Sequence, residues 1–415
     1  MTTIQEENAI LGARIKVIGI GGGGTNAINS MIKEQKCPGV EFYAMNTDAQ
    51  HLAKSNVEEQ NRILIATNNG KRLGLGAGSR PEVGRKAAEE SREEISKALE
   101  GADMVYIAGG MGGGTGTGVA PVVAGIAKEM GILTVAVVTM PYGWEGKRRW
   151  NYAVEGRRLL LQNAHTVITV RNDSLTKALE AQGLEIGLED AFKRVDSVLS
   201  DGVTGVVGII KEDGVMNLDY ADVETVMTHE GPSLMGIGYS EGPNRVEEAT
   251  FAAIHNPLLE RDIRGATGVI LSVSGKNVQY HELLQAGRIV ASFVDPDATL
   301  ITGASNNPEA KDGELRITIV ATGFPEDVID EEYPGFLDGG MQQSGGMQQM
   351  GGMQQMSGMQ QMGGMQHARV EAPVSAYTES VTAAKGTSSV EDFRNRLKEM
   401  KNSQGGSRPS WLQNK

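Results

Sequence analysis

Ten consecutive residues, GGMGGGTGTG at 109–118, comprise seven glycines, two threonines and one methionine. Glycine loses more backbone entropy on folding than any other residue, so such a run is expected where another group must approach the main chain closely. The group that most often does so is a phosphate. The run lies between a β-branched segment and a helical pattern, and it therefore predicts a ligand-binding turn in an α/β fold.

The segments around this run alternate between β-branched runs and helical patterns. We expect strands at 14–20, 40–46, 102–108 and 132–139, and helices at 25–35, 81–100 and 118–130. The second helix opens with Pro81 and closes before Gly101, an asymmetry typical of helices. Strands that alternate with helices at this spacing predict a parallel, doubly wound sheet, whose ligands bind at the carboxyl ends of the strands.

The second half of the chain predicts a long helix and another α/β domain. After a strand at 166–170, apolar residues recur at helical spacing through 188–211. Further helices are expected at about 246–254 and 281–293, with strands at 268–273, near 300 and at 315–321. A chain of 415 residues is long enough for two such domains with cores of their own.

The end of the chain has a different composition. Residues 339–366 repeat a hexapeptide built on GGMQQM, and a glycine and glutamine repeat of this short period predicts a flexible linker. The following SSVEDFRNRLKEMK places Val390, Phe393, Leu397 and Met400 on one helical face. A lone helix of this length is marginal in water. It therefore folds on a partner or frays as a solubilising tail, and both alternatives stay open.

Charge and residue usage exclude several classes of protein. A formal net charge of −13 argues against a general nucleic-acid binder. No apolar run approaches the roughly 18–20 residues of a transmembrane span, and the N-terminus lacks the features of a secretory signal. The single Cys37 excludes an internal disulfide framework, and six scattered His residues offer no metal-ligand spacing. We expect a cytoplasmic protein.

A second glycine-rich turn, GIGGGG at 19–24, also lies between an expected strand and an expected helix. Gly19, Gly21 and Gly24 match the G-x-G-x-x-G pattern of dinucleotide sites, and Asp48 follows near the place of a ribose-binding acid. This pattern alone leaves a nicotinamide-dependent oxidoreductase open, as well as a tight packing turn.

Two glycine loops exceed what a dinucleotide site needs. Their backbone amides, with the hydroxyls of Thr115 and Thr117, would surround a triphosphate. A third loop, GLGAGSRPEVG at 74–84, could close over the terminal phosphate, and no G-x-x-x-x-G-K-[ST] pattern occurs.

These motifs resemble the FtsZ family of tubulin-like GTPases of prokaryotic cell division, whose signature is GGGTGTG. The resemblance runs from about residue 14 to 324 and implies a Rossmann-like, doubly wound α/β GTPase domain, a long central helix, a second smaller α/β domain and a disordered tail. It divides the chain into an N-terminal extension (1–11), a GTP-binding domain (12–187), the central helix (188–212), an activation domain (213–324), a flexible linker (325–387) and a partner-binding tail (388–415).

The resemblance also implies the nucleotide site. The residues expected to hold phosphates, ribose and guanine are Gly22, Gly23, Gly24, Asn26, Asn46, Ala77, Gly78, Gly113, Gly114, Thr115, Gly116, Thr139, Glu145, Arg149, Asn172, Phe192 and Asp196. Within this set, Glu145 is the implied ribose acid and Asp196 the implied guanine acceptor, which would reject adenine. The implied ligands are GTP or GDP, with Mg²⁺ held through the phosphates and no metal ligand from the protein.

The segment NLDYAD at 217–222 carries the implied catalytic acids. Asp219 and Asp222 are three residues apart, so they share one face of a helix that begins here. On spacing alone, a helix cap is favoured over catalysis. The family's synergy loop has the same N-x-D-x-x-D pattern, which implies that Asn217, Asp219 and Asp222 act on the neighbouring subunit's nucleotide. The two roles are compatible.

Several positions depart from the family pattern. Arg80 stands where Asn is usual, Met140 where Lys is common, and Arg171 where Pro is common. The bacterial tail motif D-I-P-x-F-L-R is absent, so the adaptor differs or the chain is a paralogue with an accessory role.

The resemblance implies a GTPase that polymerises head to tail, is activated by polymerisation and forms a ring at the division site beneath the membrane. Its partners would be copies of itself and an adaptor protein bound by the tail, with no nucleic acid. A polymerising scaffold that does not hydrolyse GTP remains the alternative.

Overall fold

The structure, a computed structural model, describes residues 13–34, 37, 39–66, 74–174, 188–211, 219–229, 231–256, 263–306, 310–324 and 333–334. All of them belong to one compact unit, residues 1–342. The expected N-terminal extension, most of the linker and the tail lie outside the described residues.

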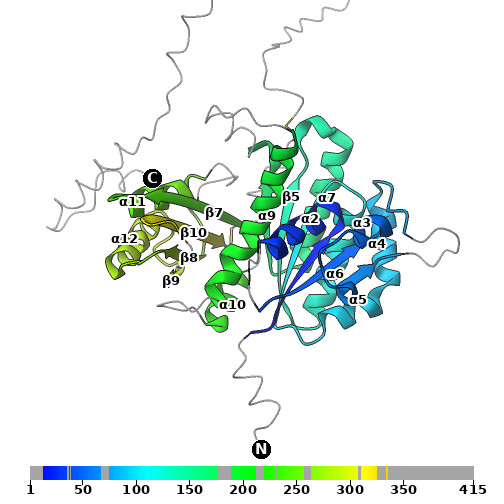
Figure 1. Cartoon of the computed structure of the whole chain (residues 1–415), viewed down its shortest axis with the longest axis horizontal. Helices are drawn as coiled ribbons and strands as arrows, with labels where there is room; N and C mark the ends of the chain where they lie inside the picture. The colour runs from blue at the N-terminus through cyan, green and yellow to red at the C-terminus, as the bar shows by residue number, and fades with distance from the viewer. Residues whose placement is uncertain are drawn as a thin grey trace, which may run out of the picture. The chain divides into compact units, whose positions relative to one another are not determined.

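Six parallel strands form the first half of the sheet, and its central strands are buried along almost their whole length (Figure 1). Their spatial order is β3-β2-β1-β4-β5-β6. The bounds are β1 (Ile15–Ile20), β2 (Glu41–Asn46), β3 (Arg62–Leu64), β4 (Met104–Gly110), β5 (Leu133–Met140) and β6 (Thr166–Arg171). The strand order reverses between β1 and β4, and such a switch point is where doubly wound sheets bind their ligands.

The second half of the sheet is mostly antiparallel. β7 (Pro232–Glu241) continues β6 in parallel through the pairs Val167–Pro232 and Ile168–Ser233. β10 (Glu314–Thr322) lies antiparallel to both β7 and β8 (Gly268–Gly275), and β9 (Thr299–Asn306) pairs in parallel with β8. Two helices, α11 (Arg245–Ile254) and α12 (Tyr280–Ala291), belong to this half.

The remaining helices surround the parallel strands or join the two halves. They are α2 (Gly21–Lys33), α3 (Ala49–Ala53), α4 (Pro81–Glu90), α5 (Arg92–Leu99), α6 (Thr115–Glu129), α7 (Lys147–Asn163), α9 (Leu188–Lys211) and α10 (Tyr220–Met227). Helix α9 packs against α2, β5 and β9, so it contacts both halves of the sheet (Figure 1). It matches the expected central helix.

The core has two layers because strand residues alternate between the two faces of the sheet. In β1, Ile18 and Ile20 join the cluster that includes α4, α5 and α6, whereas Ile15 and Val17 join the cluster that includes α2 and α9.

Some elements differ from the expectation. The helix expected over 81–100 is two helices separated at Ser91, whose backbone (φ −98°, ψ 21°) leaves the helical region. Helix α6 begins at Thr115 and α2 at Gly21, because glycines that looked like loop residues belong to first helical turns. Helix α7 was not expected, and neither was β7, whose Pro232 and two glycines are unfavourable in strands.

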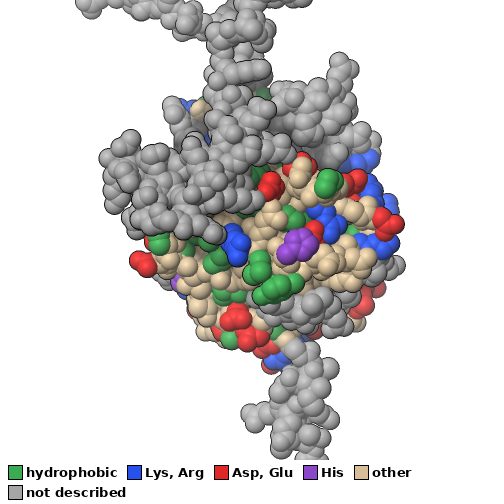
Figure 2. Space-filling view, turned by 90° about the vertical axis from the view of Figure 1, so that its left-hand side faces the viewer, with side chains coloured by type: hydrophobic (Ala, Val, Ile, Leu, Met, Phe, Trp, Pro, Cys, Tyr) green, Lys and Arg blue, Asp and Glu red, His purple; other side chains and the backbone are tan. Residues whose placement is uncertain are grey.

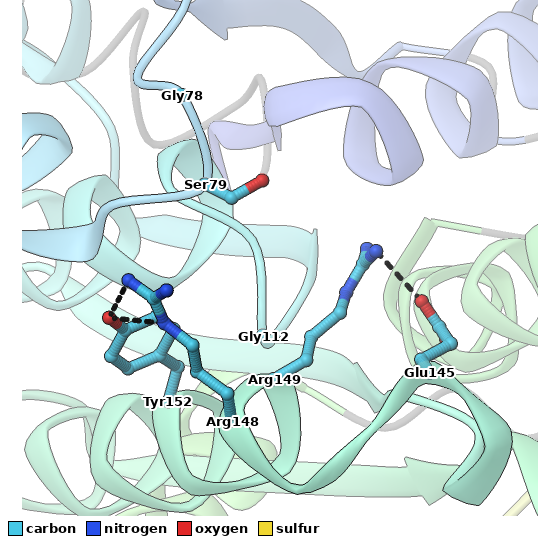
Figure 3. Close-up of a pocket in the computed structure, with 7 residues that line it drawn as sticks. All are labelled: Gly78, Ser79, Gly112, Glu145, Arg148, Arg149 and Tyr152. Atoms are coloured by element: carbon cyan, nitrogen blue, oxygen red, sulfur yellow. Dashed lines mark hydrogen bonds and ion pairs between the residues drawn. The ribbon is translucent and has the colours of Figure 1, made fainter. Parts of the chain in front are cut away.

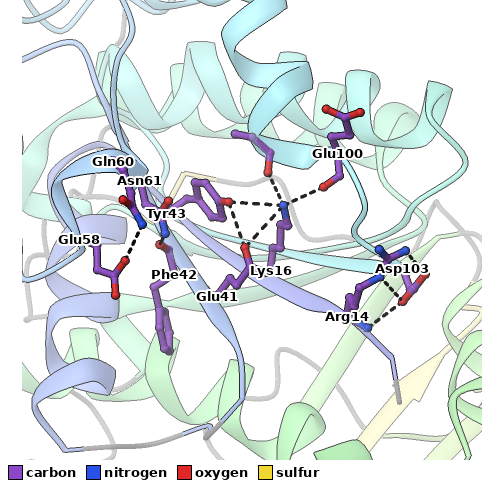
Figure 4. A network of polar contacts seen from close by, with 11 residues as sticks. Arg14, Lys16, Glu41, Phe42, Tyr43, Glu58, Gln60, Asn61, Glu100 and Asp103 are labelled. Atoms are coloured by element: carbon purple, nitrogen blue, oxygen red, sulfur yellow. Dashed lines mark hydrogen bonds and ion pairs between the residues drawn. The ribbon is translucent and has the colours of Figure 1, made fainter. Parts of the chain in front are cut away.

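A buried lysine near the start of β1 connects the parallel strands to the end of α5 (Figure 4). Lys16 on β1 donates from Nζ to the carbonyl oxygens of Ala98 at 2.8 Å and Glu100 at 2.9 Å, at the end of α5. Its Nζ also lies 3.7 Å from the Glu41 carboxylate on β2. The last carbonyls of a helix have no partner within the helix, so this cation satisfies them and ties α5 to two strands.

Figure 2 shows the face over the second half of the sheet, where acidic and basic side chains are interspersed with polar and hydrophobic ones. None of the helices within the described ranges is long and apolar enough to cross a bilayer.

Candidate functional site

Two helix N-termini meet at the switch point of the sheet. β1 leads directly into α2, and β4 leads through residues 111–114 into α6. A Cβ atom placed on Gly21 would lie 3.2 Å from the Gly116 nitrogen and 3.3 Å from Thr115 Cβ, so the two helix starts are adjacent. Neither N-cap residue, Ile20 nor Gly114, gives a side-chain hydrogen bond to its helix. First-turn N–H groups without such caps form a site for an anion.

The glycines of the two loops are of two kinds. A Cβ atom on Gly24 would lie 2.2 Å from the Ala108 oxygen, and one on Gly116 would lie 2.2 Å from the Gly110 oxygen. These two positions are glycine because strand and helix backbones touch there. By contrast, a Cβ atom on Gly113 would meet nothing within 4 Å, and one on Gly22 would have its nearest neighbour at 3.9 Å.

Packing therefore does not explain glycine at positions 22 and 113. Gly23 is similar, because its nearest neighbour would be the Gly110 nitrogen at 3.6 Å, an ordinary contact. Open backbone of this kind, beside two helix N-termini, fits the phosphates of a nucleotide.

The third loop packs onto the second. A Cβ atom on Gly114 would lie 2.7 Å from Ala77 Cβ and 2.9 Å from the Arg80 nitrogen. Gly78 and Ser79 both have positive φ, 57° and 56°, which turns the chain sharply before α4. The structure thus places Ala77 beside Gly114, and the roles predicted for Ala77 and Gly78 at a terminal phosphate stay predictions.

A cavity of about 220 Å³ lies between this loop and the start of α7 (Figure 3). Gly78 and Ser79 line one side, and Arg148 and Arg149 line the other. Arg149 pairs with Glu145 at 2.8 Å, so the implied ribose acid and arginine are adjacent. The remaining lining residues are Gly112, Glu145 and Tyr152.

Glu145 belongs to a short 3-10 turn, Gly143–Glu145. Its Oε1 accepts from the Tyr142 nitrogen at 2.9 Å, while the Asp173 carboxylate accepts from the Gly143 nitrogen at 3.0 Å. The Glu145 carboxyl group is therefore held in place by a hydrogen bond to the first residues of its own turn.

A small apolar cluster joins the segments that carry the predicted ribose and base contacts. Tyr142, Val170, Val195 and Val198 pack together. Tyr142 precedes Glu145, Val170 precedes the buried Asn172, and Val195 precedes Asp196 on α9. The cluster therefore brings these three segments to one side of the sheet.

Asp196 is the most perturbed carboxyl group of this region. Burial raises its pKa from 3.8 to about 6, because the charged form loses its hydration. Among the side chains that the structure describes, no cation lowers the pKa of this half-buried carboxyl group, which is therefore suited to accept hydrogen bonds from a ligand. The side chain of Phe192, the neighbouring predicted base contact, lies outside what the structure describes.

Five other predicted residues lie in these segments, and four of them make hydrogen bonds within the chain. Asn46 is buried and its Oδ1 accepts from the Asp48 nitrogen at 3.2 Å. Thr115 is hydrogen-bonded to the Thr47 hydroxyl at 2.6 Å, and Thr117 Oγ1 accepts from the Gly112 nitrogen at 2.8 Å. The Thr139 carbonyl accepts from the Met111 nitrogen at 2.8 Å. Asn26 lies in α2 and is exposed.

Asp48, the acid of the dinucleotide alternative, caps α3. One of its carboxylate oxygens accepts from the nitrogens of Gln50 at 2.9 Å and His51 at 3.1 Å. This local use gives the oxidoreductase alternative no support.

Asp219 caps α10 as the spacing predicted, since its Oδ1 accepts from the Asp222 nitrogen at 2.8 Å. Both acids are exposed, and Asn217 lies outside the described residues.

Next to Asp219, the Tyr220 hydroxyl donates to the Asp103 carbonyl at 2.8 Å. Asp103 precedes β4, whereas the glycine loop follows the other end of β4. The seven residues of that strand correspond to about 20 Å. The two acids therefore lie at the opposite edge of the sheet from the phosphate loops.

Sequence reasoning missed Thr47, Ser79, Arg148 and Tyr152. Thr47 directly follows Asn46, and Arg148 directly precedes Arg149, so their position next to predicted residues is the only signal that the sequence holds. Arg148 donates to the Tyr152 hydroxyl at 3.0 and 3.1 Å, a contact that depends on the unexpected helix α7.

Comparison with known proteins defines the class to which this fold and site belong. Residues 14–180 match the Tubulin/FtsZ family, GTPase domain, and residues 231–325 match the FtsZ family, C-terminal domain. The cell division protein FtsZ of Buchnera aphidicola subsp. Schizaphis graminum is 50% identical over 314 residues, which cover 75% of this chain and 79% of that protein. The chain belongs to the FtsZ family.

Two solved structures of FtsZ from M. jannaschii are similar to this one. A variant has a TM-score of 0.74 and 40% identity, covering 80% of this chain and 97% of that chain. The empty FtsZ dimer has a TM-score of 0.72 and 37% identity, covering 82% of this chain and 100% of that chain. The expected fold class is therefore confirmed.

Proposed function

We propose that this chain is a GTP-dependent, self-assembling protein that forms head-to-tail filaments and hydrolyses GTP where two subunits meet. The observation that carries the proposal is the position of the predicted catalytic acids. Asp219 and Asp222 lie at the amino-end edge of the parallel strands, about 20 Å from the glycine loops at the carboxyl ends. Within one subunit they are too far from the phosphates to act on them, so they would act on a neighbour's.

The phosphates bind at the starts of α2 and α6. Backbone N–H groups of Gly22, Gly23 and Gly24 donate from one loop, and those of Gly113, Gly114, Thr115 and Gly116 from the other. Ala77 and Gly78 contact the terminal phosphate. Mg²⁺ bound to the phosphates would supply charge neutralisation. Among the residues that the structure describes, no group of three or more His, Cys, Asp or Glu side chains could hold a metal ion.

The base and sugar bind on the side of the sheet where Glu145, Asn172 and Asp196 lie. Glu145 accepts from the ribose hydroxyls, and Arg149 stays paired with it near the phosphates. The Asp196 carboxylate accepts from the two N–H groups on the Watson–Crick edge of guanine. Adenine presents an acceptor at that place, so the ionised carboxylate selects GTP and GDP.

Hydrolysis requires a water molecule in line with the terminal phosphorus atom. Asp219 and Asp222 of the next subunit, with Asn217, orient this water and polarise it toward attack. The bond from the terminal phosphorus to the bridging oxygen then breaks, and GDP and phosphate are formed. Catalysis of this kind depends mainly on positioning. Since the terminal phosphate lies in the subunit interface, its loss weakens the contact and drives turnover of the filament.

The cellular role follows from the family. The name of the Buchnera relative, cell division protein FtsZ, supports a role in cell division. In this role a cytoplasmic protein would form a ring of filaments at the division site of the cell. The M. jannaschii dimer supports assembly from identical subunits. The tail at 388–415 would bind an adaptor near the membrane, and the linker at 325–387 would connect the tail to the filament. Apart from Tyr333 and Pro334, the tail and the linker lie outside the described residues.

The test is GTP turnover per subunit, measured over a wide range of protein concentration with Mg²⁺. We expect turnover only above a critical concentration, because the site is completed by a neighbour. Asp222→Ala is expected to retain GTP binding and filament formation while losing turnover. A turnover per subunit that does not depend on concentration would refute the shared site. Filaments of the unaltered protein without turnover would favour the non-hydrolysing scaffold.

A further inference from the structure

One aromatic residue beyond the second domain packs against the nucleotide domain. The Tyr333 hydroxyl donates to the Gly143 carbonyl at 2.7 Å, although the two residues are 190 positions apart. The Tyr333 ring meets Trp150 edge-on, with ring centroids 6.2 Å apart. Tyr333 and Pro334 are the described residues of the segment that the sequence assigns to a flexible linker, and both are half-buried.

The contact falls on the turn that carries the predicted ribose acid. Gly143 opens the 3-10 turn that ends with Glu145. The Asp173 carboxylate holds the Gly143 nitrogen at 3.0 Å, and Tyr333 holds the carbonyl of the same residue at 2.7 Å. Gly143 is therefore bound through both of its polar backbone groups by residues from distant parts of the chain.

The ring contact reaches the core beneath this turn. Trp150 is 2% exposed and lies in the first turns of α7, directly after Arg149. The Arg171 guanidinium lies 5.1 Å from the centroid of the Trp150 ring, next to Asn172. Tyr333 thus contacts the turn that ends with Glu145 and the helix that carries Arg149.

We propose that Tyr333 is a positioning residue for the nucleotide site. Its contacts fix the 142–146 turn and the start of α7, and so hold Glu145 and Arg149 where the ribose and phosphates bind. The proposal rests on the proposed function. Most hydrogen bonds of this turn are local, and Tyr333 adds one from a distant part of the chain, which reduces the ordering that nucleotide binding requires. By thermodynamic reciprocity, nucleotide binding strengthens the docking of Tyr333 to the same degree.

Full-length Tyr333→Phe removes the hydrogen bond and keeps the ring, whereas Tyr333→Ala removes both. The control is Tyr280→Ala, which deletes an exposed tyrosine at the start of α12. GDP affinity is measured by calorimetry for the three variants. We expect Tyr333→Phe to weaken GDP binding about three- to tenfold, which is the value of one hydrogen bond, and Tyr333→Ala to weaken it further. The control should bind like the unaltered protein.

Two further measurements separate positioning from general stability. In GTP turnover, we expect Tyr333→Phe to raise KM with kcat unchanged, because the acids on the neighbouring subunit are untouched. Hydrogen exchange of the 142–146 amides, measured without nucleotide, should be faster in both Tyr333 variants and unchanged elsewhere in α7.

The outcomes distinguish this inference from the proposed function. GDP affinities of both Tyr333 variants within twofold of the unaltered protein would overturn it. If the unaltered protein bound no guanine nucleotide, the proposed function would fail. In that case unchanged exchange of the 142–146 amides in Tyr333→Phe would overturn the positioning role as well.

Discussion

Two glycines of the same glycine-rich run, 109–118, give opposite predictions for a single added methyl group. Gly113→Ala places Cβ in open space, so folding should tolerate it and gain up to about 1 kcal/mol from a less flexible unfolded chain. A phosphate that approaches the backbone there would meet the methyl group and lose one charge-assisted hydrogen bond. Such a bond contributes about 1.5–3 kcal/mol, so GDP binding should weaken about ten- to hundredfold.

Gly116→Ala should behave in the reverse way. Its Cβ would lie 2.2 Å from the Gly110 oxygen, so the backbones of α6 and β4 must separate. Overpacking of this kind costs about 1–3 kcal/mol, and the better helix propensity of alanine returns up to about 1 kcal/mol. We expect a net loss of up to about 3 kcal/mol and a lower melting temperature without ligand.

The assay pairs urea unfolding of the nucleotide-free variants with calorimetric titration of GDP. If Gly113→Ala bound GDP as tightly as the unaltered protein, the open backbone at position 113 would not be a phosphate contact. If Gly116→Ala unfolded at the same urea concentration as the unaltered protein, the close approach of α6 and β4 would not constrain that position.

Three other perturbations follow from single side chains. Because burial raises the pKa of Asp196 to about 6, GDP affinity should fall between pH 7 and 5, and Asp196→Asn should lose this pH dependence in calorimetry. The raised pKa of Asp196 also affects folding: its neutral form is favoured in the folded protein at low pH, and this contribution to stability is lost as the pH rises through about 6. In urea at pH 7, nucleotide-free Asp196→Asn should therefore be more stable than the unaltered protein. Equal stability of the two would contradict the burial argument. Lys16→Met leaves the Ala98 and Glu100 carbonyls without their donor, which should lower the free energy of unfolding by about 2–4 kcal/mol in urea titrations. Tyr220→Phe removes the bond to the Asp103 carbonyl that holds the start of α10, so kcat for GTP should drop severalfold with GDP affinity unchanged, and an unchanged kcat would exclude this role.

Local sequence patterns predicted most of the parallel half of the fold. β1 and β5 are rich in β-branched residues because both of their faces are buried, and α9 shows its apolar spacing over its whole length. The patterns failed where glycine has a tertiary purpose. Gly21 and Gly116 belong to helices although glycine is a poor helix former, and β7 contains Gly236 and Gly238. A Cβ atom on Gly238 would lie 2.0 Å from the Ala249 oxygen, so close packing of α11 requires glycine there.

The candidate site was predictable as a set of motifs but not as an arrangement. Each glycine loop is local in the sequence, so its residue types and spacing indicated it, whereas Glu145 and Arg149 came from the resemblance to the FtsZ family. Contacts that join distant segments left no such signal. Thr47 meets Thr115 across 68 positions, and Tyr333 meets Gly143 across 190. The opposite placement of Asp222 and the glycine loops also required the sheet, because it depends on which end of β4 each one lies beside.

The most direct test of the shared site mixes two inactive variants. Asp222→Ala keeps its nucleotide loops but cannot activate a neighbour, whereas Gly113→Val fills its own phosphate site but still presents Asp219 and Asp222. The account predicts that each variant alone turns over little GTP and that the mixture exceeds the sum of the two severalfold, because the acids of one complete the site of the other. A mixture that equals the sum of its parts would contradict hydrolysis between subunits.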